Sequence, residues 1–328
     1  MDKSTIYNML TKFKATKVYF PQYNVAYSIL LNAIEDTEIT GEPYGAVIAG
    51  YTGAGKTTLC LHAKDKYKRR YSEVSEQGLH YRDTVVYFEV PDTVTVKGLV
   101  AAMLVDLGIS NPAGSKEQMT GQLIRLLQER KVKLVFLDEI QKLCYRSADK
   151  VRIDALGWIV SFVNRIGITV ILSGTEECLR IRSYLPAFAT RFPYQINLEF
   201  FHFSQNADSD YRRTLQKLDE SLNEITGLKP EAHLHDPSVA AALFIATSGN
   251  LGGLRRIIHV ALKRVLTRDD GNGLKWADFF YACDQVKWHT GLKSENPFFS
   301  DLTGSLEFLA SAEARVRLQN YSLQQLPN

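Results

Sequence analysis

The sequence contains little cysteine. Its four cysteines are scattered and form no CxxC pair: Cys60, Cys144, Cys178 and Cys283. This spacing argues against a zinc site or a disulfide framework, and it favours a reducing, cytoplasmic environment. The only close histidine pair is His233-x-His235. A solvated loop explains that pair more simply than a metal ion does.

Long apolar runs are also absent. No stretch is long enough to cross a bilayer, and the start MDKSTIYNMLTKFK lacks the apolar core of a signal peptide. We therefore expect no contact with a membrane. The formal net charge of +3 is too small to indicate nucleic-acid binding by itself. Any contact with DNA must come from a local basic patch.

The chain does contain a complete phosphate-binding motif. Residues 50–58, GYTGAGKTT, fill every fixed position of the P-loop pattern GxxxxGK[ST], between an apolar run and a helix-forming segment. Glycines let backbone N–H groups curl around phosphates, and the helix N-terminus adds partial positive charge. Lys56 can reach the β- and γ-phosphates, and the Thr57 hydroxyl can ligate Mg²⁺. We predict a nucleotide site formed by Gly50, Thr52, Gly53, Ala54, Gly55, Lys56, Thr57 and Thr58.

Strand and helix patterns alternate through the first 200 residues. Strand-like runs occupy 46–49, 84–90, 134–139, 168–172 and 194–200, and most of them are apolar throughout. Such runs indicate an α/β fold with a five-stranded parallel sheet that helices cover on both faces. After residue 203 only helical patterns follow, which predicts a small all-α domain.

These patterns divide the chain into four parts. We expect a basic N-terminal arm at 1–20, an α/β nucleotide-binding domain at 21–203, a helical domain at 204–293 and a C-terminal tail at 294–328. The tail is expected to be ordered only against a partner or the body of the protein. Between the P-loop helix and the second strand, a polar loop is expected up to His80.

Two carboxylates end the run at 134–139. After a complete P-loop, Asp138 is expected to hold the Mg²⁺ shell and Glu139 to polarise the attacking water. Ser173 and Thr175 follow the next run, at the place where such folds put a residue that senses the γ-phosphate. A plain serine–glycine strand exit is an equal alternative for Ser173.

Together, the P-loop, the Asp-Glu pair, the polar strand end, an Arg-Phe pair before the fifth strand and the helical domain resemble an AAA+ ATPase. The resemblance implies ATP and Mg²⁺ as ligands and a helical lid as the second domain. The segment AFATRF, residues 187–192, is similar to the family segment whose arginine reaches the neighbouring subunit's nucleotide. Arg191 would then be the arginine finger, with Arg180 and Arg182 as rivals.

A second arginine follows from the same resemblance. The segment SGNLGGLRR, residues 248–256, is similar to the start of the sensor-2 helix of AAA+ lids. This similarity makes Arg255 the expected phosphate contact and Arg256 the alternative. For each of these arginines, solvated helix charge is the competing interpretation.

Among AAA+ proteins, the sequence of these motifs is most similar to that of the TnsC/TniB regulators of DNA transposition. The similar stretches are FLDEIQKL (136–143), LSGTEE (172–177), ATRF (189–192) and TSGNLGGL (247–254). The resemblance implies a ring or filament on double-stranded DNA that couples a target selector to a transposase. Because these motifs also occur in related ATPases, a replication initiator or helicase loader is one alternative. A signalling NTPase that binds only protein is another.

DNA contacts in such an assembly require basic or hydroxyl side chains on loops that face the duplex. The resemblance makes the loop after the second strand our first choice. Surface charge without a DNA role is the competing interpretation for every candidate. The candidates are Thr93, Thr95, Lys97, Lys116 and Lys150, with Lys142, Arg146 and Arg152 as further possibilities.

Overall fold

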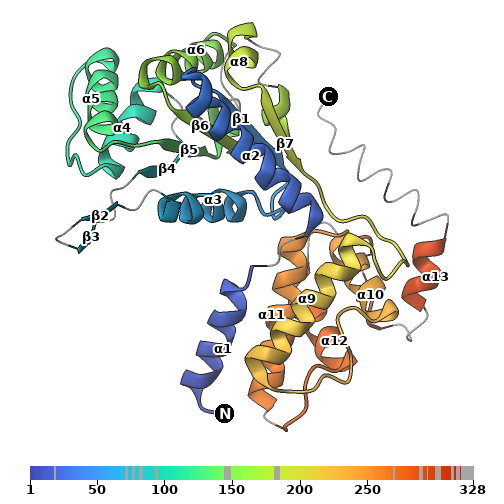
Figure 1. Ribbon diagram of the computed structural model, residues 1–328. Coiled ribbons are helices and arrows are strands. Elements are labelled where there is room, and N and C mark those ends of the chain that lie inside the picture. Colours follow the sequence, from blue (N-terminus) through green and yellow to red (C-terminus); the bar gives the residue numbers. More distant parts are fainter. Residues whose placement is uncertain are drawn as a thin grey trace. The chain divides into compact units, whose positions relative to one another are not determined.

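The computed structural model describes most of the chain. The described residues are 1–17, 20–70, 73–75, 78–80, 84–92, 95–143, 149–180, 185–268, 270–287, 291–293, 295–299, 304–311, 314 and 318. They form two compact units, which we describe separately (Figure 1). The α/β unit is Gln22–Leu198, and the helical unit combines Met1–Pro21 with Glu199–Asn328. Along the sequence, the α/β unit thus lies between the two segments of the helical unit.

A parallel sheet organises the α/β unit. Its five strands are β1 (Gly45–Gly50), β4 (Val85–Glu89), β5 (Leu134–Asp138), β6 (Thr169–Gly174) and β7 (Tyr194–Leu198). Among the described residues they lie in the order β4-β5-β6-β1-β7, and all neighbours are parallel. The predicted five-stranded parallel sheet is therefore confirmed. Because parallel strands end at one edge, the P-loop and Asp138 share that edge.

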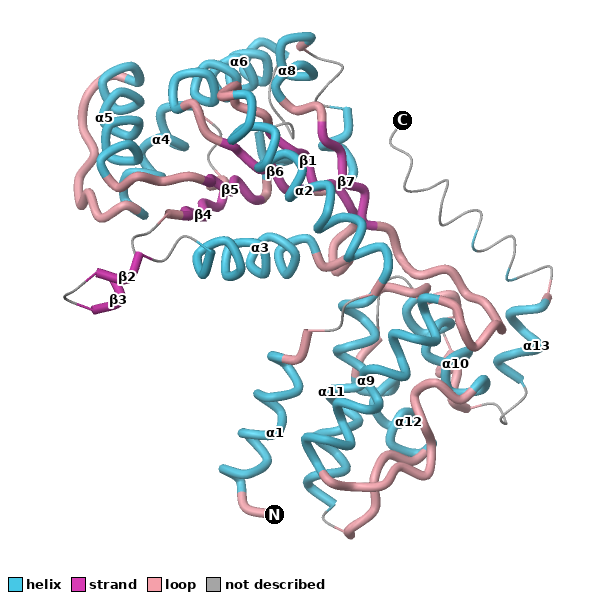
Figure 2. Tube along the Cα trace, in the orientation of Figure 1, coloured by secondary structure: helices cyan, strands magenta, loops and turns pink. Residues whose placement is uncertain are grey.

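Helices cover both faces of this sheet (Figures 1 and 2). On one face lie α4 (Val96–Asp106), α5 (Lys116–Glu129), α6 (Asp149–Ile166) and α8 (Pro186–Arg191). Their apolar side chains form one buried core with alternate strand residues, among them Val47, Phe88 and Leu172. The other face is covered by α3 (Lys56–Arg70), which contacts β1, β4 and β6 and packs against α2 (Pro21–Thr40).

A short hairpin follows α3. Its strands are β2 (Glu73–Ser75) and β3 (Gly78–His80), which pair antiparallel. The expected polar loop up to His80 is therefore wrong for these two segments. Strands of three residues are too short to show an alternating apolar pattern, so composition alone indicated a loop.

The helical unit consists of α1, packed on α9 and α11, together with α10, α12 and α13. Their bounds are α1 (Lys3–Ala15), α9 (Asp210–Thr226), α10 (Pro237–Thr247), α11 (Leu251–Arg268), α12 (Trp276–Gln285) and α13 (Gly304–Ala310). The segment that we expected to be a basic arm thus forms a helix of this unit, and its Phe13 side chain is buried. None of the described helices is long and apolar enough to cross a membrane.

Part of the expected tail also packs on the helical unit. The ring of Phe298 stacks on the ring of Phe279, with the two centroids 5.4 Å apart. The backbone carbonyl oxygen of Phe298 accepts a hydrogen bond from Trp276 Nε1 at 2.8 Å. Further along the chain, α13 packs on α10. The α/β unit ends at Leu198 with β7, slightly before the boundary expected at residue 204.

Candidate nucleotide-binding site

The P-loop connects β1 to α3 at the carboxyl edge of the sheet. Gly55 has a φ of 100°, which residues with a Cβ rarely adopt. Gly50 lies so close to β7 that a Cβ atom there would be 2.4 Å from the Leu198 carbonyl oxygen. Both fixed glycines are therefore required by backbone geometry. The remaining predicted ligands occupy the loop and the first turn of α3: Thr52, Gly53, Ala54, Lys56, Thr57 and Thr58.

The ammonium group of Lys56 lies inside this loop. Its Nζ donates to the carbonyl oxygens of Gly50 at 2.7 Å and Tyr51 at 3.0 Å, and the residue is only 8% exposed. Burial lowers the pKa of Lys56, and the negative charges of Asp138 and Glu139 oppose that shift. A phosphate group in the loop would offer this cation a charged acceptor in place of two neutral carbonyls.

Asp138 is a buried acceptor at the end of β5. Its Oδ2 accepts hydrogen bonds from the Thr57 hydroxyl at 3.1 Å and from the Tyr87 hydroxyl, and its Oδ1 accepts from the Glu139 N–H at 2.9 Å. Burial, together with the hydrogen bond to Asp138, raises the pKa of Tyr87, so the phenol stays protonated. The Thr57 hydroxyl and the Asp138 carboxylate supply the hard oxygen donors that Mg²⁺ prefers. These residues fit the expected metal.

Glu139 is held by a neighbouring amide. The Gln141 Nε2 atom donates to Glu139 Oε2 at 2.6 Å, and Gln141 Oε1 accepts from the Thr175 N–H at 3.1 Å. A Cβ atom at Gly174 would lie 2.4 Å from Gln141 Oε1, so glycine makes room for this bridge between the ends of β5 and β6. The φ of Glu139 itself is 61°, an unusual value for a residue with a side chain. The backbone and Gln141 together fix where the Glu139 carboxylate points.

Ser173 lies in β6, beside Ile48 of β1. The residue is 1% exposed, and its Oγ has no nitrogen or oxygen partner among the described residues. Buried hydroxyl groups usually have such a partner. The side chain of Thr175 differs, because its hydroxyl bonds the Glu177 carboxylate. The Ser173 hydroxyl interacts with the Cys60 thiol, and its sensing role stays a prediction.

Arg191 ends α8 and forms one ion pair with an exposed carboxylate. Its NH1 atom lies 3.6 Å from Glu42 Oε2, and the two side chains are 26% and 63% exposed. An exposed pair of this kind contributes only about 0–1 kcal/mol, so the guanidinium can exchange this partner for another. Arg182 and the side chain of Arg180 lie outside the described residues. The choice among these three arginines stays a prediction.

Arg255 lies in α11 of the helical unit and binds the end of α1. Its guanidinium donates to the carbonyl oxygens of Phe13 at 2.7 Å, Thr16 at 2.9 Å and Lys14 at 3.1 Å. A cation is favourable at a helix C-terminus, where carbonyl groups lack helical partners. The neighbouring Arg256 is exposed. The expected phosphate contact of Arg255 remains a prediction.

The DNA candidates differ in their surroundings. Thr95 caps α4, since its Oγ1 accepts from the Gly98 N–H at 3.0 Å. Lys142 pairs with Glu89 at 3.1 Å and Asp92 at 3.0 Å, and Lys116 pairs with Glu117 at 3.5 Å. Lys97, in the first turn of α4, is exposed and has no ion pair among the described residues. Candidates that lie outside the described residues, wholly or by their side chains, are Thr93, Arg146 and Lys150.

The sequence analysis did not predict two residues of the site, Tyr87 and Gln141. Tyr87 lies in β4, which pairs with β5 in a register that sets Tyr87 beside Phe136 and Glu89 beside Asp138. Gln141 follows the acidic pair by two positions, in the short 3₁₀ helix Ile140–Leu143. Neither residue type has a fixed place in the P-loop pattern. The pairing of β4 with β5, which the sequence pattern does not encode directly, brings Tyr87 into the site, and Gln141 enters it through the turn after β5.

The comparisons with known proteins agree with this geometry. Residues 40–181 match a family model described as an AAA domain. A comparison with curated proteins gave no match. Among solved structures, the chain is similar to the Aeropyrum pernix ORC1 protein, with a TM-score of 0.59 and 16% identity over 82% of this chain and 66% of the other. It thus spans slightly less than two thirds of the length of that protein.

Two further structures show the same similarity. Cdc6p from Pyrobaculum aerophilum has a TM-score of 0.59 and 12% identity, covering 99% of this chain and 90% of its own. The Aeropyrum pernix ORC2 protein has a TM-score of 0.54 and 16% identity, and the match covers 85% of this chain and 72% of that protein. Identities this low show the fold alone. Residues 40–181 are thus similar to AAA domains, and the chain has the AAA+ fold of the ORC and Cdc6 structures, with a helical C-terminal region.

Proposed function

We propose that the chain is an Mg²⁺-dependent ATPase. The observation that carries this proposal is the convergence of Lys56, Thr57, Asp138 and Glu139 at one edge of the sheet, with Thr57 and Asp138 in direct contact at 3.1 Å. Lys56 and the P-loop N–H groups would bind the phosphates, and the two oxygen donors would hold Mg²⁺. Glu139, oriented by Gln141, would accept the proton of the attacking water.

The proposed biological role is regulation of DNA transposition. We infer that the protein oligomerises on double-stranded DNA with ATP and couples a target selector to a transposase, as its resemblance to TnsC/TniB proteins implies. The similar Aeropyrum pernix ORC1 protein was solved in complex with DNA, and the ORC2 protein with ADPNP and ADP. Those structures support DNA and nucleotide as ligands. They also favour a second candidate function, replication initiation or helicase loading.

An assembly experiment tests this proposal. The protein is mixed with long duplex DNA, with ATP, a non-hydrolysable analogue or no nucleotide, and viewed by electron microscopy alongside a gel shift. We expect rings or filaments on DNA only with nucleotide. Stimulation of an integrase-type transposase encoded beside this chain would support transposition, whereas loading of a replicative helicase would support the second candidate. Absence of DNA binding under all conditions would contradict both.

Glu139→Gln should keep ATP bound and stop its turnover. The amide has the shape of the carboxylate and can still bond Gln141, but it cannot accept a proton from water. Loss of a general base costs about 10²–10⁴ in rate, so hydrolysis should fall by at least about 100-fold. Steady-state phosphate release measures the rate, and nucleotide titration confirms binding. Hydrolysis at the parental rate would rule out Glu139 as the base.

Lys97→Ala should weaken binding to every duplex sequence alike. Lys97 lies in the first turn of α4, which follows β4 in the chain, and lacks an acidic partner among the described residues, so a phosphate is its expected partner. One lost phosphate contact lowers the slope of log affinity against log salt by about 0.9. The matched control is Lys133→Ala, because Lys133 is exposed at the opposite, amino end of β5. An unchanged slope would assign the contact to another loop.

A further inference from the structure

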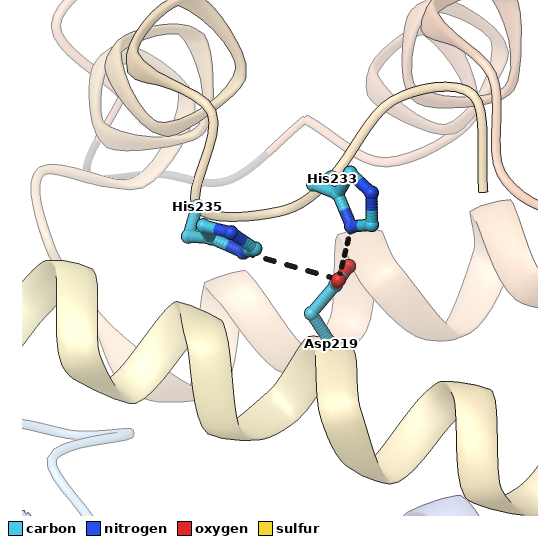
Figure 3. A group of neighbouring side chains, drawn as sticks. All are labelled: Asp219, His233 and His235. Atoms are coloured by element: carbon cyan, nitrogen blue, oxygen red, sulfur yellow. Dashed lines mark hydrogen bonds and ion pairs between the residues drawn. The ribbon is translucent and has the colours of Figure 1, made fainter. Parts of the chain in front are cut away.

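Two histidines and an aspartate converge in the helical unit (Figure 3). Asp219 lies in α9, and His233 and His235 lie in the segment that leads into α10. One ligand atom from each of the three side chains lies within 4.8 Å of the others. Nothing in the proposed ATPase or DNA-binding role uses this cluster.

Asp219 is a buried carboxylate on the apolar side of α9. It is 3% exposed, and Leu215, Leu218 and Leu222 of the same helix are buried with it. A buried charge is costly unless it is paired and hydrogen-bonded. Its Oδ1 accepts from the Leu234 N–H at 3.0 Å. The second oxygen, Oδ2, faces the two imidazoles (Figure 3). Among the described residues, both ion-pair partners of Asp219 are histidines.

The two imidazoles use this oxygen unequally. His233 Nδ1 lies 2.6 Å from Asp219 Oδ2, whereas His235 Nδ1 lies 3.9 Å from it, beyond hydrogen-bond distance. His235 Nδ1 is buried and has no hydrogen-bond partner among the described residues. A nitrogen that is shielded from water and aimed at a carboxylate, yet bonded to nothing, is a costly arrangement for hydrogen bonding alone. It is the arrangement that a shared cation between the three atoms would satisfy.

We propose that Asp219, His233 and His235 bind one divalent transition-metal ion of the zinc type. Zinc–nitrogen bonds of about 2.0–2.1 Å and zinc–oxygen bonds of about 2.0–2.2 Å place tetrahedral ligand atoms about 3.4 Å apart. The two separations from Asp219 Oδ2, 2.6 Å and 3.9 Å, lie on either side of that value. Small side-chain rotations therefore bring both nitrogens into the first coordination sphere.

The kinds of ligand atom at this site favour some metal ions over others. Two imidazole nitrogens and one carboxylate suit Zn²⁺, Co²⁺ or Ni²⁺, whereas Mg²⁺ requires oxygen ligands. Three protein ligands leave one position for water or a donor from another molecule. The bound ion would fasten α9 to the segment before α10. Sequence spacing did not reveal this site because Asp219 lies on a helix, distant in sequence from the histidine pair that it completes.

Calorimetry on the full chain tests the site. The protein carries no histidine tag, is freed of nucleotide because nucleotides bind divalent cations, and is titrated with Zn²⁺, Co²⁺, Ni²⁺ or Mg²⁺. We expect one equivalent of Zn²⁺ per chain, a visible absorption band with Co²⁺, and no binding of Mg²⁺ at this site. Zn²⁺ at a hundredfold excess over its Kd should raise the melting temperature of the helical unit by about 5–10 °C.

His235→Ala is the decisive variant, because the buried Nδ1 of His235 has no hydrogen-bond partner among the described residues that the substitution would remove. It should retain the metal-free melting temperature and lose Zn²⁺ affinity by at least about 100-fold. His202→Ala is the control, since His202 is exposed and pairs with Glu199 at 3.7 Å; it should bind Zn²⁺ normally. Absence of stoichiometric binding, or equal binding by the His235 variant, would overturn the site and leave an ordinary carboxylate–histidine pair.

Discussion

Lys56→Ala should abolish ATP binding. The ammonium group is the cation enclosed by the P-loop, held by carbonyl oxygens at 2.7 and 3.0 Å, and without it the phosphates meet only backbone dipoles. Charge-assisted hydrogen bonds are about twice as strong as neutral ones, so the remaining N–H groups cannot compensate. Titration with a fluorescent ATP analogue measures the loss.

The control for this variant lies on the same helix. Lys66 is an exposed residue of α3 whose ammonium lies 5.1 Å above the Tyr27 ring, and Lys66→Ala should bind ATP normally. Circular dichroism should show both variants folded. Normal nucleotide affinity in the Lys56 variant would contradict the assignment of the P-loop as the ATP site.

Arg191→Ala should bind ATP yet fail to hydrolyse it or to assemble cooperatively. An arginine finger acts on the neighbouring subunit's nucleotide, so its loss leaves each P-loop intact and damages the composite site. Removal of such a finger costs roughly 10³–10⁵ in turnover. Arg165→Ala, which removes an exposed arginine at the end of α6, should have no effect on turnover measured by phosphate release.

Mixing the two inactive variants distinguishes a finger from a residue that acts within its own subunit. In a mixed oligomer, an intact P-loop from the Arg191 variant can meet an intact arginine from the Lys56 variant, so part of the activity should return. If Arg191→Ala assembles and turns over ATP normally, the finger is reassigned to Arg182 or Arg180. Should all three arginines prove dispensable, a protein-only switch becomes the better account.

The sequence predicted those parts of the fold that local patterns encode. Apolar runs marked most strands of the sheet because these strands are covered on both faces, and β5 and β6 are buried along their whole length. The edge strand β7 was marked by alternating residues instead, and its burial alternates in the same way. Helical patterns after residue 203 predicted the helices of the C-terminal region, and α9 ends at Gly227, whose φ of 68° is typical of a glycine after a helix. The hairpin of β2 and β3 was missed because its strands are short and polar.

Parts of the candidate site depend on long-range pairing and could not be predicted in this way. The P-loop and the acidic pair were found because the first is a fixed local pattern and the second ends a buried strand. Tyr87 reaches Asp138 through the register of β4 with β5, and Gln141 reaches Thr175 across the sheet edge. Likewise, nothing local to Arg255 indicates that it binds the end of α1.

The contact between Arg255 and α1 has a consequence for the order in which the protein is made. Arg255 and Thr16 are 239 positions apart, so α1 leaves the ribosome long before its partner helix α11 exists. The intervening α/β unit, Gln22–Leu198, can complete its sheet during that interval, since domains generally fold as units during synthesis. Until α9 and α11 have been made, Phe13 has no apolar surface of the helical unit on which to dock. The Phe13 side chain, which is buried in the folded protein, therefore stays exposed to solvent until late in synthesis.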